Sequence, residues 1–103
     1  LSVCGFATDN FVFYGFPPSK NKRQQFWQKI AETKPAAVFF ESPYHIIKSL
    51  TELAEAIGER QVMVARELTK KFETIYRGSA SEILDIFSSA ERRGEFVLVV
   101  DRF

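Results

Sequence analysis

The spacing of hydrophobic residues along the chain predicts a series of strands and helices. Mostly apolar runs predict strands at 11–16, 37–40, 61–67 and 95–101, and the half-polar stretch 74–77 predicts a shorter strand at a sheet edge. Positions 62–65 and 97–100 are apolar without alternation. Such runs are typical of strands that are buried on both faces of a sheet.

Three further stretches carry apolar residues three or four positions apart, which is the helical spacing. The first, 20–32, is mostly polar and carries Phe26, Trp27 and Ile30 on one face. The second, 46–57, ends before Gly58, a residue type that commonly stops helices. The third follows Ser79. Ser79 and Glu82 have the spacing of a capping box, which marks the start of a helix. Its inward side chains are expected to be those of Ala80, Ile83, Leu84 and Phe87.

These elements follow the order β-α-β-α-β-β-α-β, which indicates an α/β fold with a mixed five-stranded sheet and about three helices packed on it. The chain has 103 residues, of which 46% are hydrophobic, so residues 1–103 suffice for one domain with its own core. No internal repeat or low-complexity linker divides the chain.

Ionisable side chains are dense at 66–73, directly after the apolar run 62–65. In sheets covered by helices, ligands collect at the carboxyl ends of the strands. Charged groups that are buried there without partners cost folding free energy. The stretch is therefore either a solvated turn, which is the commoner use of a charge cluster, or a ligand site.

A second strand also leads into polar residues, because 37–40 is followed by Glu41, Ser42 and Pro43. Ser42 is expected to cap the helix at 46–57, and Pro43 suits a first helical position. The amides at the start of this helix form a small polar site beside the strand end. A well-capped helix without a ligand is the alternative.

Composition limits the chemistry that the chain offers. Cys4 is the only cysteine and His45 the only histidine, so the sequence predicts neither an internal disulfide nor a metal site. No apolar stretch approaches the ~20 residues of a membrane span, and no signal-peptide pattern opens the chain. These features predict a soluble cytoplasmic protein without a membrane partner.

The net charge of +1 gives no global attraction to nucleic acid. A local group of basic residues nevertheless surrounds the aromatic pair at 26–27, namely Lys20, Lys22, Arg23, Lys29 and Lys34. We expect an ordinary solvated helix face whose aromatic residues face the core. A contact with an RNA backbone is the alternative, because lysine and arginine bind phosphates without reading sequence.

Several motifs together resemble the tetrapyrrole-methylase superfamily, in the order in which that family carries them. They are the stretch 1–11, Phe-Pro-Pro at 16–18, Phe-Phe-Glu-Ser-Pro at 39–43, Ala-Arg-Glu-Leu-Thr-Lys at 65–70, Arg-Gly at 77–78 and Gly-Glu-Phe-Val-Leu-Val-Val at 94–100. The run at 65–70 resembles the motif of one branch of this family, whose members methylate a ribose 2′-oxygen of small-subunit ribosomal RNA. The family's motif has His-Arg where this chain has Tyr44 and His45.

The resemblance spans essentially the whole chain but matches only the family's carboxy-terminal lobe. It implies S-adenosylmethionine as the cofactor, bound between this lobe and an amino-terminal lobe that carries the glycine-rich loops. The residues implied in cofactor binding are Glu41, Ser42, Pro43, Ala65, Arg66, Leu68 and Thr69. Lys70 and Glu67 are the candidates to assist proton removal from a ribose hydroxyl, although positioning alone is the commoner way to use such groups.

The resemblance also implies the partners of the chain. The substrate would be ribosomal RNA in the small ribosomal subunit, and the amino-terminal lobe of the same protein would complete the site; a homodimer is left open. Because the chain begins at Leu1 and has no glycine-rich loop, we expect an excised lobe that is inactive alone. The rival interpretations are a lobe of a corrin or porphyrin methylase and a non-catalytic RNA-binding module.

Overall fold

The computed structural model describes residues 2–3, 6–7, 10–68, 71–87 and 94–102. Its main feature is a five-stranded sheet with the strand order β3-β4-β7-β5-β6. The strands are β3 (Phe11–Gly15), β4 (Ala36–Glu41), β5 (Gln61–Leu68), β6 (Lys71–Ser79) and β7 (Glu95–Val100). Only the β3–β4 pair is parallel, and the other neighbours are antiparallel. The predicted mixed sheet of five strands is therefore confirmed.

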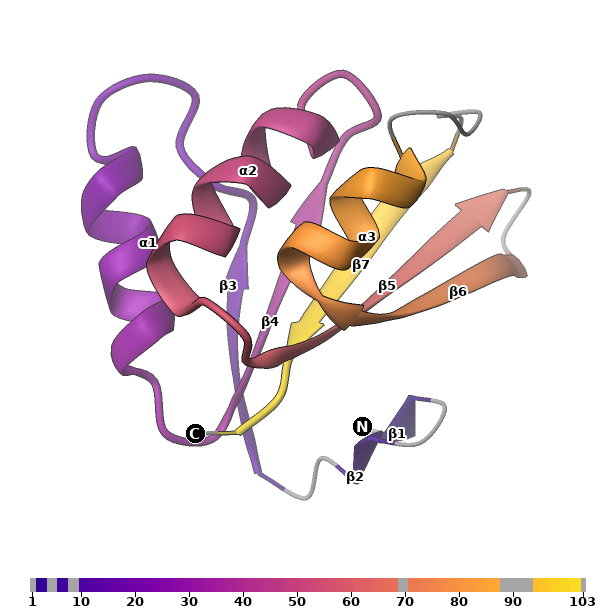
Figure 1. Cartoon of the computed structure of the whole chain (residues 1–103), viewed down its shortest axis with the longest axis horizontal. Coiled ribbons are helices and arrows are strands. Elements are labelled where there is room, and N and C mark those ends of the chain that lie inside the picture. Colours follow the sequence, from indigo (N-terminus) through magenta and orange to yellow (C-terminus); the bar gives the residue numbers. More distant parts are fainter. Residues whose placement is uncertain (1, 4–5, 8–9, 69–70, 88–93, 103) are drawn as a thin grey trace.

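Three helices cover one face of this sheet (Figure 1). They are α1 (Arg23–Glu32), α2 (Ile46–Ile57) and α3 (Ala80–Phe87). The main core lies between these helices and the inward residues of β4, β5 and β7, with the fully buried Phe39, Val64 and Leu98 at its centre. The opposite face is also buried, since Met63 and Val99 are 0% exposed. Burial of both faces explains the unbroken apolar runs in β5 and β7.

The predicted capping box of α3 is confirmed in both directions. The Ser79 amide donates to Glu82 Oε1 at 2.8 Å, and the Glu82 amide donates to Ser79 Oγ at 3.3 Å. Helix α2 likewise covers the predicted apolar pattern at 46–57 and stops before Gly58, whose φ is 63°. None of the described helices is long and apolar enough to cross a membrane.

Two predicted elements have clearly different bounds in the structure, and one small hairpin is additional. Helix α1 begins at Arg23 rather than Lys20, because Lys22 has a left-handed backbone with a φ of 72° that ends the preceding loop. The short predicted strand at 74–77 belongs to the nine-residue strand β6, which lies at a sheet edge as expected. A small hairpin of β1 (Ser2–Val3) and β2 (Phe6–Ala7) was not predicted.

Candidate functional site

The topology brings four chain segments together at one end of the strands, which we call the carboxyl edge of the sheet. Strands β3, β4 and β5 run in the same direction, and β7, which pairs with both β4 and β5, runs in the opposite one. The carboxyl ends of three strands and the amino end of β7 therefore meet at the upper edge in Figure 1. This is the edge at which ligands of helix-covered sheets collect.

The two polar segments singled out in the sequence lie together at this edge. Glu41 in β4 and Arg66 in β5 are both register partners of Phe96 in β7, so a single strand separates them. Two strand spacings place their backbones about 10 Å apart. The sequence motifs at 39–43 and 65–70 thus belong to one region of the surface.

A cavity of about 320 Å³ opens at the same edge, on the sheet face opposite the helices, and is lined by Phe16, Phe40, Glu67, Glu95, Phe96 and Val97. Two phenylalanines form an aromatic wall, since the ring centroids of Phe16 and Phe40 are 5.5 Å apart. Phe16 keeps 59% of its surface exposed.

Two glutamates also line the cavity. Glu67 and Glu95 are register partners on neighbouring strands, so their side chains leave the same face of the sheet. Like charges in this position repel each other. A bound cation would relieve that repulsion, which makes the cavity suited to a ligand with a positive charge beside an apolar part.

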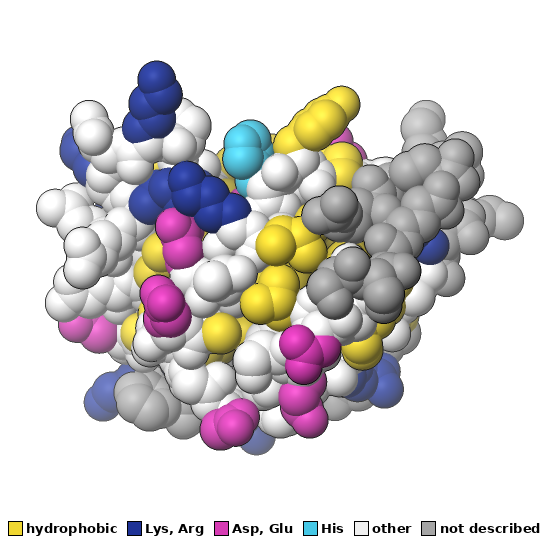
Figure 2. All heavy atoms as spheres, turned by 45° about the horizontal axis from the view of Figure 1, so that its top comes forward, with side chains coloured by type: hydrophobic (Ala, Val, Ile, Leu, Met, Phe, Trp, Pro, Cys, Tyr) yellow, Lys and Arg dark blue, Asp and Glu magenta, His cyan; other side chains and the backbone are white. Residues whose placement is uncertain are grey.

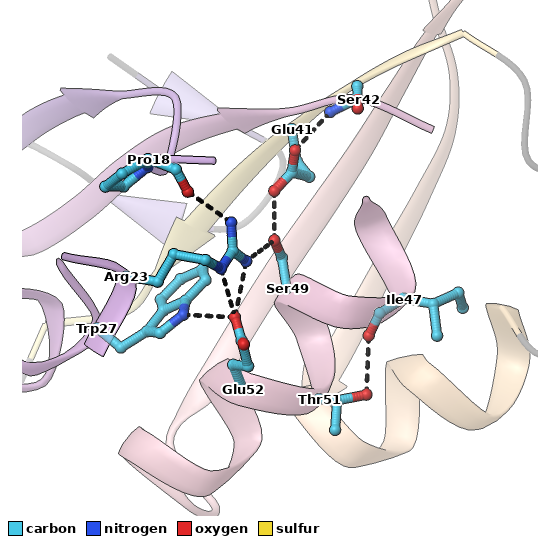
Figure 3. A network of polar contacts seen from close by, with 9 residues as sticks. All are labelled: Pro18, Arg23, Trp27, Glu41, Ser42, Ile47, Ser49, Thr51 and Glu52. Carbon is cyan, nitrogen blue, oxygen red and sulfur yellow. Dashed lines mark hydrogen bonds and ion pairs between the residues drawn. The ribbon is translucent and has the colours of Figure 1, made fainter. Parts of the chain in front are cut away.

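Glu41 has a different role, because its side chain points into the protein. It is 4% exposed, and its carboxylate accepts hydrogen bonds from the Ser42 amide at 2.9 Å and from the Ser49 hydroxyl (Figure 3). The carboxylate thereby holds the turn that follows β4. Glu41 is placed to position this turn, and only the turn itself reaches the surface of the site.

Arg23 extends this network to the loop that follows β3 (Figure 3). Its guanidinium donates to the Pro18 carbonyl at 2.7 Å, to Ser49 Oγ at 3.0 Å and to Glu52 Oε1 at 2.7 Å. The indole of Trp27 donates to the same Glu52 oxygen at 2.8 Å. A single network of buried and partly buried contacts therefore fixes both loops at the carboxyl ends of the strands.

The network sets the ionisation of Glu52. Burial raises the pKa of the Glu52 carboxyl, but the hydrogen bonds from Arg23 and Trp27 and the positive charges of Arg23 and Lys48 lower it further than burial raises it. The result is a pKa below the ordinary value of 4.5, so Glu52 carries its negative charge at neutral pH.

The expectation that Ser42 caps helix α2 is wrong, as is the placement of Pro43 at its first position. The helix begins at Ile46 with His45 at the N-cap, and no side chain caps it. The Ser42 hydroxyl is instead 3.1 Å from Nδ1 of the exposed His45. Residues 42–45 form a separate turn, because the Glu41 carboxylate binds the Ser42 amide and the His45 amide donates to the Ser42 carbonyl.

The remaining predicted site residues lie in or after β5. Ala65 is fully buried, Arg66 donates to Thr74 Oγ1 at 3.0 Å, and Leu68 ends the strand. Thr69 and Lys70 lie outside the described residues.

Sequence reasoning missed two inward polar residues that the site depends on. Arg23 precedes Phe26 and Ile30 by three and seven positions, and Ser49 follows Ile46 by three, so both lie on inward helix faces. That spacing was the available signal. The role of Phe16 and Glu95 as cavity walls had no local signal.

The surface around this edge is mixed in character. Figure 2, which turns the edge toward the viewer, shows basic side chains beside the histidine and hydrophobic side chains close by. Among the exposed residues of the two loops are Lys20, Lys22 and Tyr44, the last of which is 92% exposed. The aromatic pair of α1 is turned away from this surface, because Phe26 and Trp27 are buried in the core, as expected.

Comparison with known proteins gives consistent matches. Residues 1–84 match the sequence profile of the family described as Tetrapyrrole (Corrin/Porphyrin) Methylases. A Synechocystis protein named ribosomal RNA small subunit methyltransferase I is 41% identical over 102 residues, which cover 97% of this chain and 37% of that protein. A protein of the same name from Thermotoga maritima is 34% identical over 100 residues, which cover 97% of this chain and 45% of the relative. The chain thus spans less than half the length of these relatives.

Among solved structures, the chain is similar to a cobalamin biosynthetic enzyme, cobalt precorrin-4 methyltransferase. The TM-score is 0.59 at 17% sequence identity, and the match covers 86% of this chain and 40% of the other. At this identity the likeness concerns the fold. It confirms the α/β architecture that the sequence predicted.

Proposed function

Because the chain belongs to the tetrapyrrole methylase family, we propose that it is one lobe of an S-adenosylmethionine-dependent methyltransferase. The lobe contributes the carboxyl edge of its sheet to a cofactor site, and a second lobe of the same protein closes over that site. The length of the relatives supports this division, since the chain covers only 37% of the Synechocystis protein and 45% of the Thermotoga protein.

The observation that carries the proposal is the cavity lined by two phenylalanines and by two glutamates on neighbouring strands. S-adenosylmethionine combines a positively charged sulfonium with an adenosine. Glu67 and Glu95 complement the sulfonium charge or accept hydrogen bonds from ribose hydroxyls, and the rings of Phe16 and Phe40 suit contact with adenine. A volume of about 320 Å³ is at the low end for ligand sites, as half of a site should be.

The chemistry then requires alignment more than covalent participation. S-adenosylmethionine supplies a methyl group that is already activated, so the protein must orient the attacking oxygen and support loss of its proton. The turn at 42–43, held by Glu41, and the segment 65–69 would position the cofactor. Lys70 and Glu67 are the candidates to assist proton loss.

The proposed substrate is a ribose 2′-hydroxyl in small-subunit ribosomal RNA, because the relatives bear the name of that activity. Such a substrate would place the reaction in the cytoplasm. The test is to incubate the full-length protein with small ribosomal subunits and labelled S-adenosylmethionine, digest the RNA and locate the methyl group by mass spectrometry. We expect it on a ribose. A methyl group on a base, or transfer only to a corrin or porphyrin, would contradict the proposal.

Glu95→Gln should weaken binding of S-adenosylmethionine by the full-length protein at least fivefold. This corresponds to about 1 kcal/mol, the size of one screened charge interaction. S-adenosylhomocysteine has the same ammonium and carboxylate groups but a neutral thioether in place of the sulfonium. Its affinity should stay nearly constant, because the proposed partner of Glu95 is the sulfonium charge. Calorimetric titration of both compounds measures the difference. Glu59→Gln, at another exposed glutamate, is the control; equal losses for both compounds in Glu95→Gln would rule out a role in charge recognition.

A further inference from the structure

A groove of about 390 Å³ lies beside the loop that joins β3 to α1. Its lining combines Tyr14, Phe16 and the largely buried Phe26 with Lys22 and Lys29, and its described residues include no carboxylate. Both lysines are exposed. The groove therefore offers aromatic rings beside two positive charges, which is the composition of sites that bind unpaired nucleic acid.

Phe16 connects this groove to the candidate cofactor site. The same side chain lines the groove and the cavity that holds Glu67 and Glu95. With 59% of its surface exposed, the Phe16 ring is available for contact with a ligand. A ligand in the groove would thus be next to a ligand in the cavity, with the Phe16 ring shared between them.

The backbone conformation of Lys22 is a second observation that supports a binding role for its side chain. With a φ of 72°, Lys22 is the one non-glycine residue with positive φ in the described part of the chain. Glycine adopts this left-handed conformation most readily, whereas other residues are strained in it. Strained residues of this kind concentrate at ligand-binding sites, where the side chain is needed.

We propose that this groove binds an unpaired segment of the RNA substrate beside the methyl donor. Lys22 and Lys29 contact backbone phosphates, and Phe16 stacks on a base. The inference rests on the proposed function and adds the surface by which the substrate is held. Arg23, although part of the same basic stretch, does not contribute, because its charge is paired with Glu52 inside the protein.

The test is Lys22→Gly in the full-length protein. Glycine removes the charge and also the backbone strain, so the melting temperature should not fall. Affinity for a single-stranded oligoribonucleotide and for small-subunit ribosomal RNA should nevertheless drop about threefold or more, and the slope of log K against log salt should shrink by about 0.7, the loss of one phosphate contact. Affinity for S-adenosylmethionine should not change.

The matched control is Lys34→Gly. Lys34 is an exposed lysine that precedes the amino end of β4, at the other end of the strands. It should leave the RNA affinity and the salt slope as they are. If Lys22→Gly behaves like this control in both measurements, the groove is not an RNA site, while the proposed methyl transfer is untouched. A lower melting temperature with unchanged RNA affinity would also overturn the inference, because Lys22 would then serve the fold and not the RNA. Absence of any RNA binding by the unmodified protein would overturn both the inference and the proposed substrate.

Discussion

Arg23→Met should lower the free energy of unfolding of this chain by about 2 kcal/mol, between the values for exposed and for fully buried ion pairs. The Arg23 side chain is 10% exposed and that of Glu52 30% exposed. Methionine fills similar space but leaves the Glu52 carboxylate and the Pro18 carbonyl without the guanidinium that binds them. Chemical denaturation of both proteins at neutral pH measures the difference.

The pH dependence provides a second readout of the same substitution. Because Arg23 helps to hold the pKa of Glu52 below 4.5, the stabilisation is present above 4.5 and is lost as the pH falls through the lowered pKa. The unmodified chain should therefore lose more stability on acidification than the variant does. Lys34→Met, an exposed lysine, should change stability by no more than about 0.5 kcal/mol. If both variants are equally stable, the network around Arg23 does not hold the fold.

The features that the sequence predicted correctly are those whose partners lie close together along the chain. The capping box joins Ser79 to Glu82, three residues away, and the bounds of α2 follow from its own apolar spacing and Gly58. The sheet could be anticipated because unbroken apolar strands and helical stretches alternate. Local rules suffice for such elements.

The features that could not be predicted depend on partners far apart in the chain. Arg23 binds Ser49 and Glu52, which are 26 and 29 residues away, so its burial follows only from the packing of α1 against α2. The prediction that Ser42 caps helix α2 was wrong for a related reason. The neighbouring Glu41 carboxylate, fixed by Ser49, holds the Ser42 amide and keeps the turn separate from the helix. Tertiary contacts determined this turn.

The 103-residue chain alone should fold but transfer methyl groups at least about a hundredfold more slowly than the full-length protein. In the proposed function it supplies one wall of the cofactor site, formed by the turn after β4, the end of β5 and the cavity beside Phe16. Without a second wall, neither the cofactor nor the attacking oxygen would be held in line. The hydrophobic core between the sheet and its helices is formed by residues of this chain, so the loss should be one of activity and not of folding.

The most direct measurement compares the two proteins in one assay of tritiated methyl transfer to small ribosomal subunits. Circular dichroism establishes in parallel that the lone chain is folded. We predict transfer by the full-length protein and none above background by the folded chain. Robust turnover by the 103-residue chain alone would contradict the account, because the site that it carries would then be whole.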